Sequence, residues 1–139
     1  MRSRLWILPT TVLFGYSPAS AQTNNSFDGH WLTTVSCPDA RDALGYSFRF
    51  ISEVKDGRLS GTQGVNGKPS SLHIEGDLGS DGQARLYATG HTGSKEFVPG
   101  RDTPRGTSYG YDISAHFDQR TGAGARLEGR PCSLSFEKQ

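Results

Sequence analysis

The residues best suited to ligand binding lie in one long polar stretch, residues 91–107. Lys95, Arg101 and Arg105 carry positive charge, and a guanidinium group matches the geometry of a carboxylate or a phosphate. Phe97 is an aromatic side chain in this otherwise polar stretch. The pattern predicts a ligand-binding loop formed by these four residues. The alternative interpretation is that the charges are only solvated and that Phe97 packs back against the domain.

Catalytic and metal-binding patterns are not found in the sequence. It contains no nucleophile-elbow, zinc-protease or phosphate-loop motif. Its four histidines show no metal-ligand spacing with the cysteines. Asp112 and His116 are too far apart along one strand for a reliable hydrogen bond, and Glu75 and Asp77 are expected to repel each other on an outer face. We therefore expect a non-catalytic protein without a metal or cofactor.

The first 21 residues have the features of an export signal. Arg2 and Arg4 precede a short apolar segment, and small residues occupy 19–21. The apolar segment is shorter than the roughly 20 residues that span a bilayer, and no cysteine follows it to carry a lipid. We expect cleavage before Gln22, export to the periplasm or the medium, and no stable membrane insertion.

Without that signal the formal net charge changes from +1 to −1, because two arginines and no acid are removed. A nearly neutral chain argues against a nucleic-acid partner. Residues 22–26 are expected to form a flexible lead-in, with a weak glycosylation sequon at 24–26. Residues 27–139 fit one domain, and we expect a monomer.

Cys37 and Cys132 are the only cysteines and lie near opposite ends of that domain. In an exported chain, two cysteines at this separation are expected to form one structural disulfide.

Polar and apolar residues alternate along most of the chain, which is typical of strands half buried in an all-β domain. The predicted strands are 30–37, 46–54, 58–62, 71–78, 84–90, 109–118, 122–129 and 131–137. Eight short strands joined in series favour a small antiparallel up-and-down barrel, in which first and last strands are neighbours. The two cysteines would then meet at one rim. A β-sandwich is the alternative.

The connections after the first, third and fifth predicted strands are long, and alternate connections of such a barrel lie at the same end. The disulfide end is therefore expected to carry the functional loops. Its polar and aromatic candidates are Asp39, Arg41, Asp42, Asn66, Lys68, His91, Lys95, Phe97, Arg101, Asp102, Arg105 and Arg130.

The interior of an eight-stranded barrel is either filled by side chains or holds one small ligand. Several small residues are predicted to point inward, where they leave room or permit bending: Gly61, Gly76, Gly90, Ala115, Ala123 and Ala125.

Three short motifs indicate a resemblance. They are Phe27-Asp28-Gly29-His30-Trp31, Ser36-Cys37-Pro38 and Gly129-Arg130-Pro131-Cys132. Together they resemble small exported β-domain proteins of alphaproteobacteria without an assigned activity. The Gly29-x-Trp31 start also resembles lipocalin and avidin barrels, in which a first-strand tryptophan closes the base.

Two functions remain open at this point. One is a barrel that binds a small molecule or peptide at the long-loop rim. The other is a protein-interaction module, such as an envelope factor or an inhibitor, that uses the same rim or an outer strand face. A concave site favours the first, and a filled barrel favours the second.

Overall fold

A computed structural model describes residues 11–17, 26–100 and 102–139. Residues 11–17 are exposed and have no regular secondary structure. The rest of the predicted signal peptide, residues 22–25 of the lead-in and Arg101 lie outside the described residues. None of the described helices is long and apolar enough to cross a membrane.

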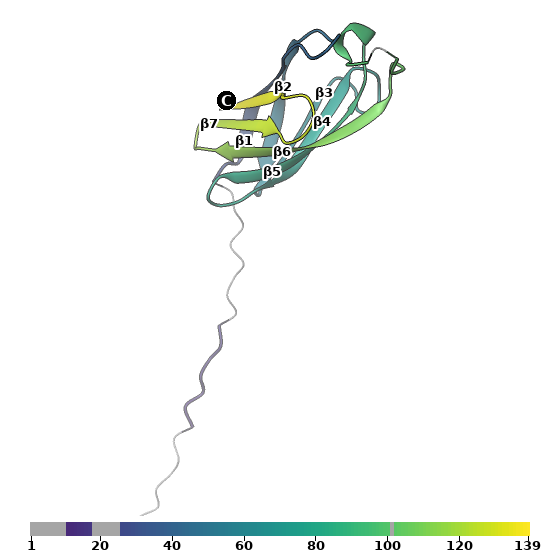
Figure 1. Ribbon diagram of the computed structural model, residues 1–139. Helices are drawn as coiled ribbons and strands as arrows, with labels where there is room; N and C mark the ends of the chain where they lie inside the picture. Colours follow the sequence, from purple (N-terminus) through teal and green to yellow (C-terminus); the bar gives the residue numbers. More distant parts are fainter. Residues whose placement is uncertain (1–10, 18–25, 101) are drawn as a thin grey trace, which may run out of the picture.

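The domain is a closed antiparallel barrel in which each strand pairs with the next (Figure 1). Its strands are β1 (Gly29–Cys37), β2 (Tyr46–Lys55), β3 (Arg58–Gln63), β4 (Ser71–Leu78), β5 (Gln83–His91), β6 (Ser108–Phe117), β7 (Thr121–Arg126) and β8 (Ser133–Lys138). A short helical turn, η1 (Lys95–Phe97), interrupts the β5–β6 loop. Pairing of β1 with β8 closes the barrel, so the predicted barrel is confirmed and the sandwich is wrong.

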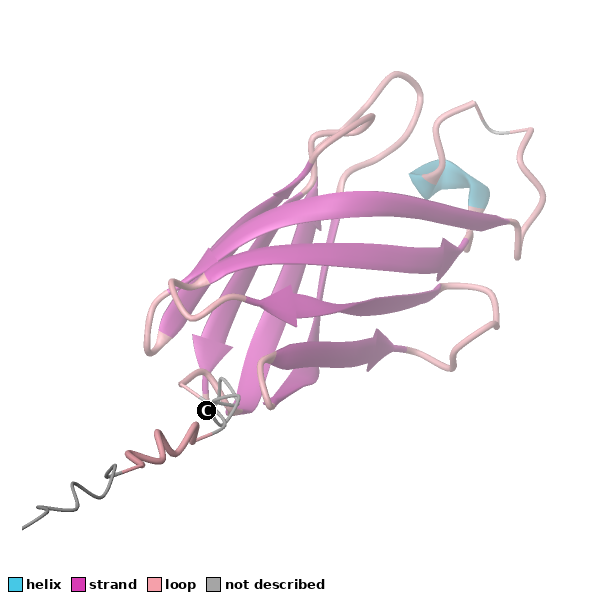
Figure 2. Cartoon of the chain, turned by 90° about the horizontal axis from the view of Figure 1, so that it is seen from below, coloured by secondary structure: helices cyan, strands magenta, loops and turns pink. Residues whose placement is uncertain are grey.

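The two ends of the barrel differ, as the loop lengths predict. The turns 56–57, 79–82 and 118–120 form one end, here called the base. The loops 38–45, 64–70, 92–107 and 127–132 form the other, here called the loop end. Figure 2 shows η1 and its long loop at the end of the barrel away from the C-terminus.

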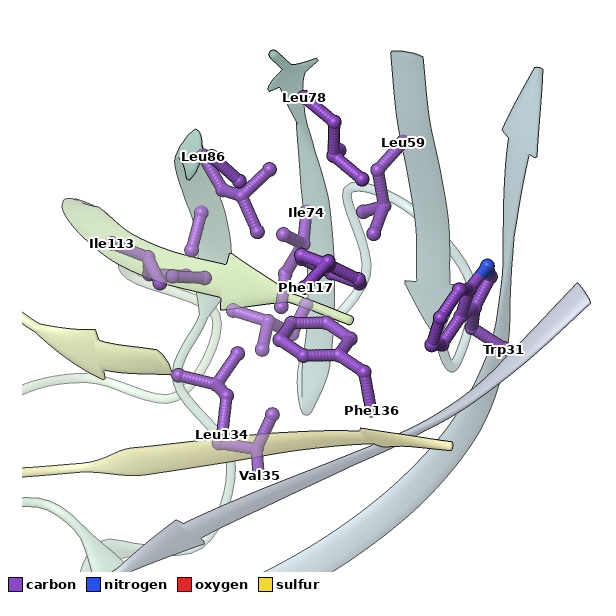
Figure 3. Packing of buried hydrophobic residues seen from close by; sticks show 14 of the residues in the cluster. Trp31, Val35, Leu59, Ile74, Leu78, Leu86, Ile113, Phe117, Leu134 and Phe136 are labelled. Carbon is purple, nitrogen blue, oxygen red and sulfur yellow. The ribbon is translucent and has the colours of Figure 1, made fainter. Parts of the chain in front are cut away.

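The half of the interior near the base is densely filled by apolar side chains (Figure 3). Trp31 is 0 % exposed and meets the Phe117 ring edge-on at 5.1 Å, and Phe117 packs against Phe136 at 4.6 Å. The indole Nε1 of Trp31 donates a hydrogen bond to the Phe27 carbonyl, so the buried polar atom is satisfied. Trp31 is therefore a fully buried part of the core near the base.

The prediction for β7 is wrong by one residue. Ala123 and Ala125 are exposed, while Gly124 and Arg126 take the inward positions. The reason is the register with β6: the buried Ile113 pairs with Arg126, and directly paired residues share one face of a sheet.

At two of the small inward residues, Gly61 and Gly90, neighbouring side chains fill the space. A side chain at Gly61 would overlap Ser52 and Phe50, and one at Gly90 would overlap the ring of Tyr109. Neighbouring side chains therefore use the space that these glycines provide.

Candidate functional site

The disulfide lies at the loop end, as predicted. Cys37 ends β1, Cys132 directly precedes β8, and both are buried. The bond therefore joins the first and last strands where the barrel closes.

Arg130 connects three segments of the loop end. Its guanidinium donates hydrogen bonds to the carbonyls of Pro38 (2.8 Å), Phe97 (2.9 Å) and Leu44 (2.7 Å). Its Cζ atom also lies 5.1 Å from the centre of the Tyr46 ring. The sequence suggests Arg130 only as a rim residue. These contacts show that it has a structural role.

Two further bonds hold the β1–β2 and β5–β6 loops together. The amide of Leu44 donates to the carbonyl of Glu96 (2.7 Å), and the amide of Gly100 donates to a carboxylate oxygen of Asp42 (3.0 Å). Figure 1 shows the two loops side by side at the loop end. The long loop therefore reaches from the β5–β6 side of the barrel to the β1–β2 side.

The four predicted ligand-binding residues belong to this loop. Phe97 is 38 % exposed and meets Tyr46 edge-on, with 6.0 Å between ring centres. This contact matches the alternative in which Phe97 packs back on the barrel. Lys95 and Arg105 are exposed, and Arg101 lies outside the described residues. Ligand binding by these four residues stays a prediction.

Aromatic side chains line two facing walls in the loop half of the interior. On β2, Tyr46 stacks on Phe48 at 5.8 Å, and Phe48 stacks on Phe50 at 6.1 Å. On β6, Tyr109 stacks on Tyr111 at 6.2 Å. Since β2 and β6 are four strands apart in the closed order of eight, the two stacks lie on opposite walls.

Arg126 completes this group from β7. Its Cζ atom lies 4.2 Å from the centre of the Tyr111 ring, a cation–π contact, and its Nε donates to the Glu128 carbonyl at 2.6 Å. A Cβ at Gly129 would lie 2.9 Å from Nη2, and the φ of Gly129 is +78°. A larger residue there would be strained and would push on the guanidinium.

We call Tyr46, Tyr109, Tyr111 and Arg126 the tyrosine–arginine cluster. Burial raises the pKa of Tyr109 to about 12, and Tyr46 adds to the rise while Arg126 opposes it. Burial also raises the pKa values of Tyr46 and Tyr111, again opposed by nearby arginines. The three phenols are therefore neutral hydrogen-bond donors at neutral pH.

Solvent reaches the phenol oxygens of the cluster. Within the described part of the chain, no residue forms a hydrogen bond with them, and every fully buried side-chain nitrogen or oxygen has a partner. Since the phenol oxygens have none, they cannot be fully buried, although Tyr111 as a whole is only 8 % exposed. Each of the three phenol oxygens therefore keeps some exposed surface and has no hydrogen-bond partner among the described residues.

The outer wall carries an ion-paired group and two shallow hollows. Glu75 and Asp77 do not simply repel each other, because Arg58 lies 3.5 Å from one and 3.1 Å from the other. Two shallow hollows lie on this wall, one lined by Glu53, Lys55, Asp56, Arg58 and Ser60, the other by Gln83, Ser114, Ala115, His116, Ala123, Gly124 and Ala125. Among residues 11–17, 26–100 and 102–139, no group of three or more His, Cys, Asp or Glu side chains is placed to hold a metal ion.

Comparisons of the chain with protein-family models, with curated proteins and with solved structures gave no match. The fold class therefore rests on the strand pairing alone, and the functional argument rests on the residues of the loop end.

Proposed function

We propose that this chain is an exported, non-catalytic binding protein whose ligand enters the loop half of the barrel and contacts the tyrosine–arginine cluster. The observation that carries the proposal is the polar-aromatic lining of this half, in which three phenol oxygens without a hydrogen-bond partner lie near a guanidinium group. Such a lining, mostly aromatic with a few polar groups, is typical of sites for small organic ligands.

Export agrees with the disulfide between Cys37 and Cys132, because disulfides persist in oxidising compartments. Sequencing the N-terminus of the protein recovered from the periplasm or medium tests this part. A start at Gln22 supports it, and an uncleaved chain that remains inside the cell contradicts it.

Native mass spectrometry of the mature, oxidised protein, exported by its own signal and purified without denaturant, tests the binding function. We expect extra mass that disappears on unfolding. In a matched pair of variants, Arg126→Met should lose that mass and Arg85→Met, on the outer wall, should keep it. Retention by both variants would contradict binding at the cluster.

A protein partner is the second candidate, because each loop at the loop end exposes one large apolar side chain. These are Leu44 (53 % exposed), Val65 (67 %), Phe97 (38 %) and Leu127 (49 %). The base turns 56–57, 79–82 and 118–120 contain no large apolar residue. Apolar side chains gathered at one end of a domain favour a protein contact there.

A photo-crosslinking amino acid at Val65 or Leu127, with Gln119 at the base as the matched control, separates the two candidates. A protein adduct from both loop positions and none from Gln119 would favour the protein partner. Extra mass in the native spectrum without such an adduct would favour the small ligand.

A further inference from the structure

We propose that the ligand is a small organic acid in which a short spacer links a carboxylate to an aromatic ring, with the carboxylate against Arg126 and the ring against the aromatic side chains of β2 and β6. This inference rests on the proposed function and specifies its ligand. Three features of the cluster support it: the charge of Arg126, the phenol donors and the aromatic rings.

The charge of Arg126 is not compensated within the site. The groups in contact with its guanidinium are neutral, namely the Tyr111 ring, the Glu128 carbonyl and the backbone at Gly129. No ion pair joins it to a carboxylate anywhere in the described ranges. Arg58 on the outer wall shows the contrast, because it lies within 3.5 Å of two carboxylates. A partly buried guanidinium with only neutral neighbours attracts an anion, and its planar fork suits a carboxylate.

The three phenol groups also favour a negatively charged ligand. Phenols are protonated at neutral pH and burial raises the pKa values of Tyr46, Tyr109 and Tyr111 further, so all three are able to donate to an anion. Arg126 is close enough to act electrostatically on all three, so a ligand held by a phenol also experiences its positive charge. A cationic ligand at this position would be repelled.

The rings account for the apolar part of the ligand. The planes of Tyr46 and Phe48 differ by 9°, and those of Tyr109 and Tyr111 by 8°, so each wall presents aligned rings. Tyr46, Phe48 and Tyr109 are only partly buried. A planar ring is the shape that stacks or packs edge-on against such surfaces.

Isothermal titration calorimetry of the mature, oxidised protein with phenylacetate, phenylacetamide and acetate tests the inference. Phenylacetamide keeps the shape but loses the charge, and acetate keeps the charge but loses the ring. We expect phenylacetate to bind at least about tenfold more tightly than either. Equal affinity for phenylacetamide, or no saturable binding of phenylacetate, would overturn it.

Arg126→Met should weaken phenylacetate binding by at least about tenfold and leave phenylacetamide binding unchanged. Arg126→Lys, which keeps the charge without the planar fork, should lie between Arg126→Met and the wild type, and Arg85→Met should match the wild type. Melting temperatures of all variants identify any that fail to fold. Unchanged phenylacetate binding by a folded Arg126→Met protein would overturn the inference.

A carboxylate beside an aromatic ring also occurs at the end of a peptide. A tetrapeptide that ends in phenylalanine, as the free acid and as the amide, identifies the source. Tighter binding of the free acid than of phenylacetate points to a peptide terminus, and weaker binding points to a free small acid. If none of these probes binds while native mass spectrometry still shows a retained ligand, the carboxylate inference fails and the proposed function stands.

Discussion

The two halves of the barrel interior are built from the same alternation of strands but filled with different chemistry. Near the base, Trp31, Phe117 and Phe136 fill the space, and polar groups such as the hydroxyls of Thr33 and Ser52 bond to each other at 2.8 Å. At the loop end the rings bear hydroxyl groups, solvent reaches them, and a guanidinium lies among them.

This difference assigns separate tasks to the two halves. Buried apolar rings stabilise the fold by leaving water, and they present nothing that recognises a particular ligand. Phenols and a guanidinium contribute less to folding but discriminate between ligands through charge and hydrogen bonding. Changes near the base should therefore mainly affect stability, and changes in the cluster should mainly affect binding.

The largest expected effect is the loss of Trp31. Trp31→Ala removes a fully buried ring and one hydrogen bond, and should lower the free energy of unfolding by about 3–5 kcal/mol. Tyr109→Phe, at the loop end, removes only a solvent-reached hydroxyl and should cost less than about 1 kcal/mol. Urea denaturation followed by circular dichroism measures both. Similar losses for the two variants would contradict the division of the interior.

Reduction of the Cys37–Cys132 disulfide should have an effect of similar or slightly smaller size. The bond closes a loop across a sequence separation of 95, which contributes on the order of 4 kcal/mol in the chain-entropy model. Calorimetry with and without reductant should show a marked fall in melting temperature. The Cys37→Ser/Cys132→Ser protein is the control and should be insensitive to reductant. An unchanged melting temperature in the wild type would show that the bond does not stabilise the barrel.

Loss of Arg130 should have a smaller, local effect. Arg130→Ala removes three hydrogen bonds to carbonyls of two loops and should destabilise the protein by about 1–2 kcal/mol. Hydrogen exchange should accelerate at the Leu44 amide, which bonds across these loops, and stay unchanged at Leu78 near the base. Arg85→Ala is the matched control. Uniform acceleration throughout the barrel would mean that Arg130 does not act locally.

The smallest expected effect is a fall in the stability of the folded protein at alkaline pH. Burial first, and then Tyr46, raises the pKa of Tyr109 to about 12 from 10.0. Since the folded state retains this proton longer than the unfolded chain, its stabilising contribution is complete below pH 10 and is lost as the pH rises to about 12. Absorbance of phenolate should show one fewer tyrosine titrating near pH 12 in Tyr109→Phe. Ionisation of Tyr109 near pH 10 would contradict its burial.

The barrel, the disulfide and the position of the long loops were all predictable from the sequence. Strong alternation in β6 predicts a strand with one buried face, and the placement of Cys37 and Cys132 fits a barrel whose first and last strands are neighbours. The sequence did not show which residues of β7 point inward. Its residues are small, and alanine, which is more apolar than glycine, suggests that Ala123 and Ala125 are the buried ones. The short turn between β6 and β7 determines this phase. The amide of Asp118 donates a hydrogen bond to the carbonyl of Thr121, so the residues that flank them, Phe117 and Gly122, are paired.

The wrong inward face predicted for β7 explains why the sequence did not indicate Arg126 as a site residue. If Ala123 and Ala125 pointed inward, Arg126 would point outward and Leu127 inward, whereas in the structure Arg126 takes an inward position and Leu127 is 49 % exposed. A sequence shows charged loop residues such as Lys95 and Arg105 directly. The contacts of Arg126 with Tyr111 and of Arg130 with two loops depend on tertiary proximity, which strand patterns do not show.

Hydroxyl-radical footprinting of the mature, oxidised protein, analysed by mass spectrometry of its peptides, tests the division of the interior most directly. Tryptophan is intrinsically at least as reactive as tyrosine, so modification reports access to solvent. The account predicts oxidation of Tyr46 and Tyr109, with the outer-wall residue Tyr87 as the exposed reference, and protection of Trp31. Oxidation of Trp31 as fast as Tyr109, or protection of both loop-end tyrosines, would contradict it.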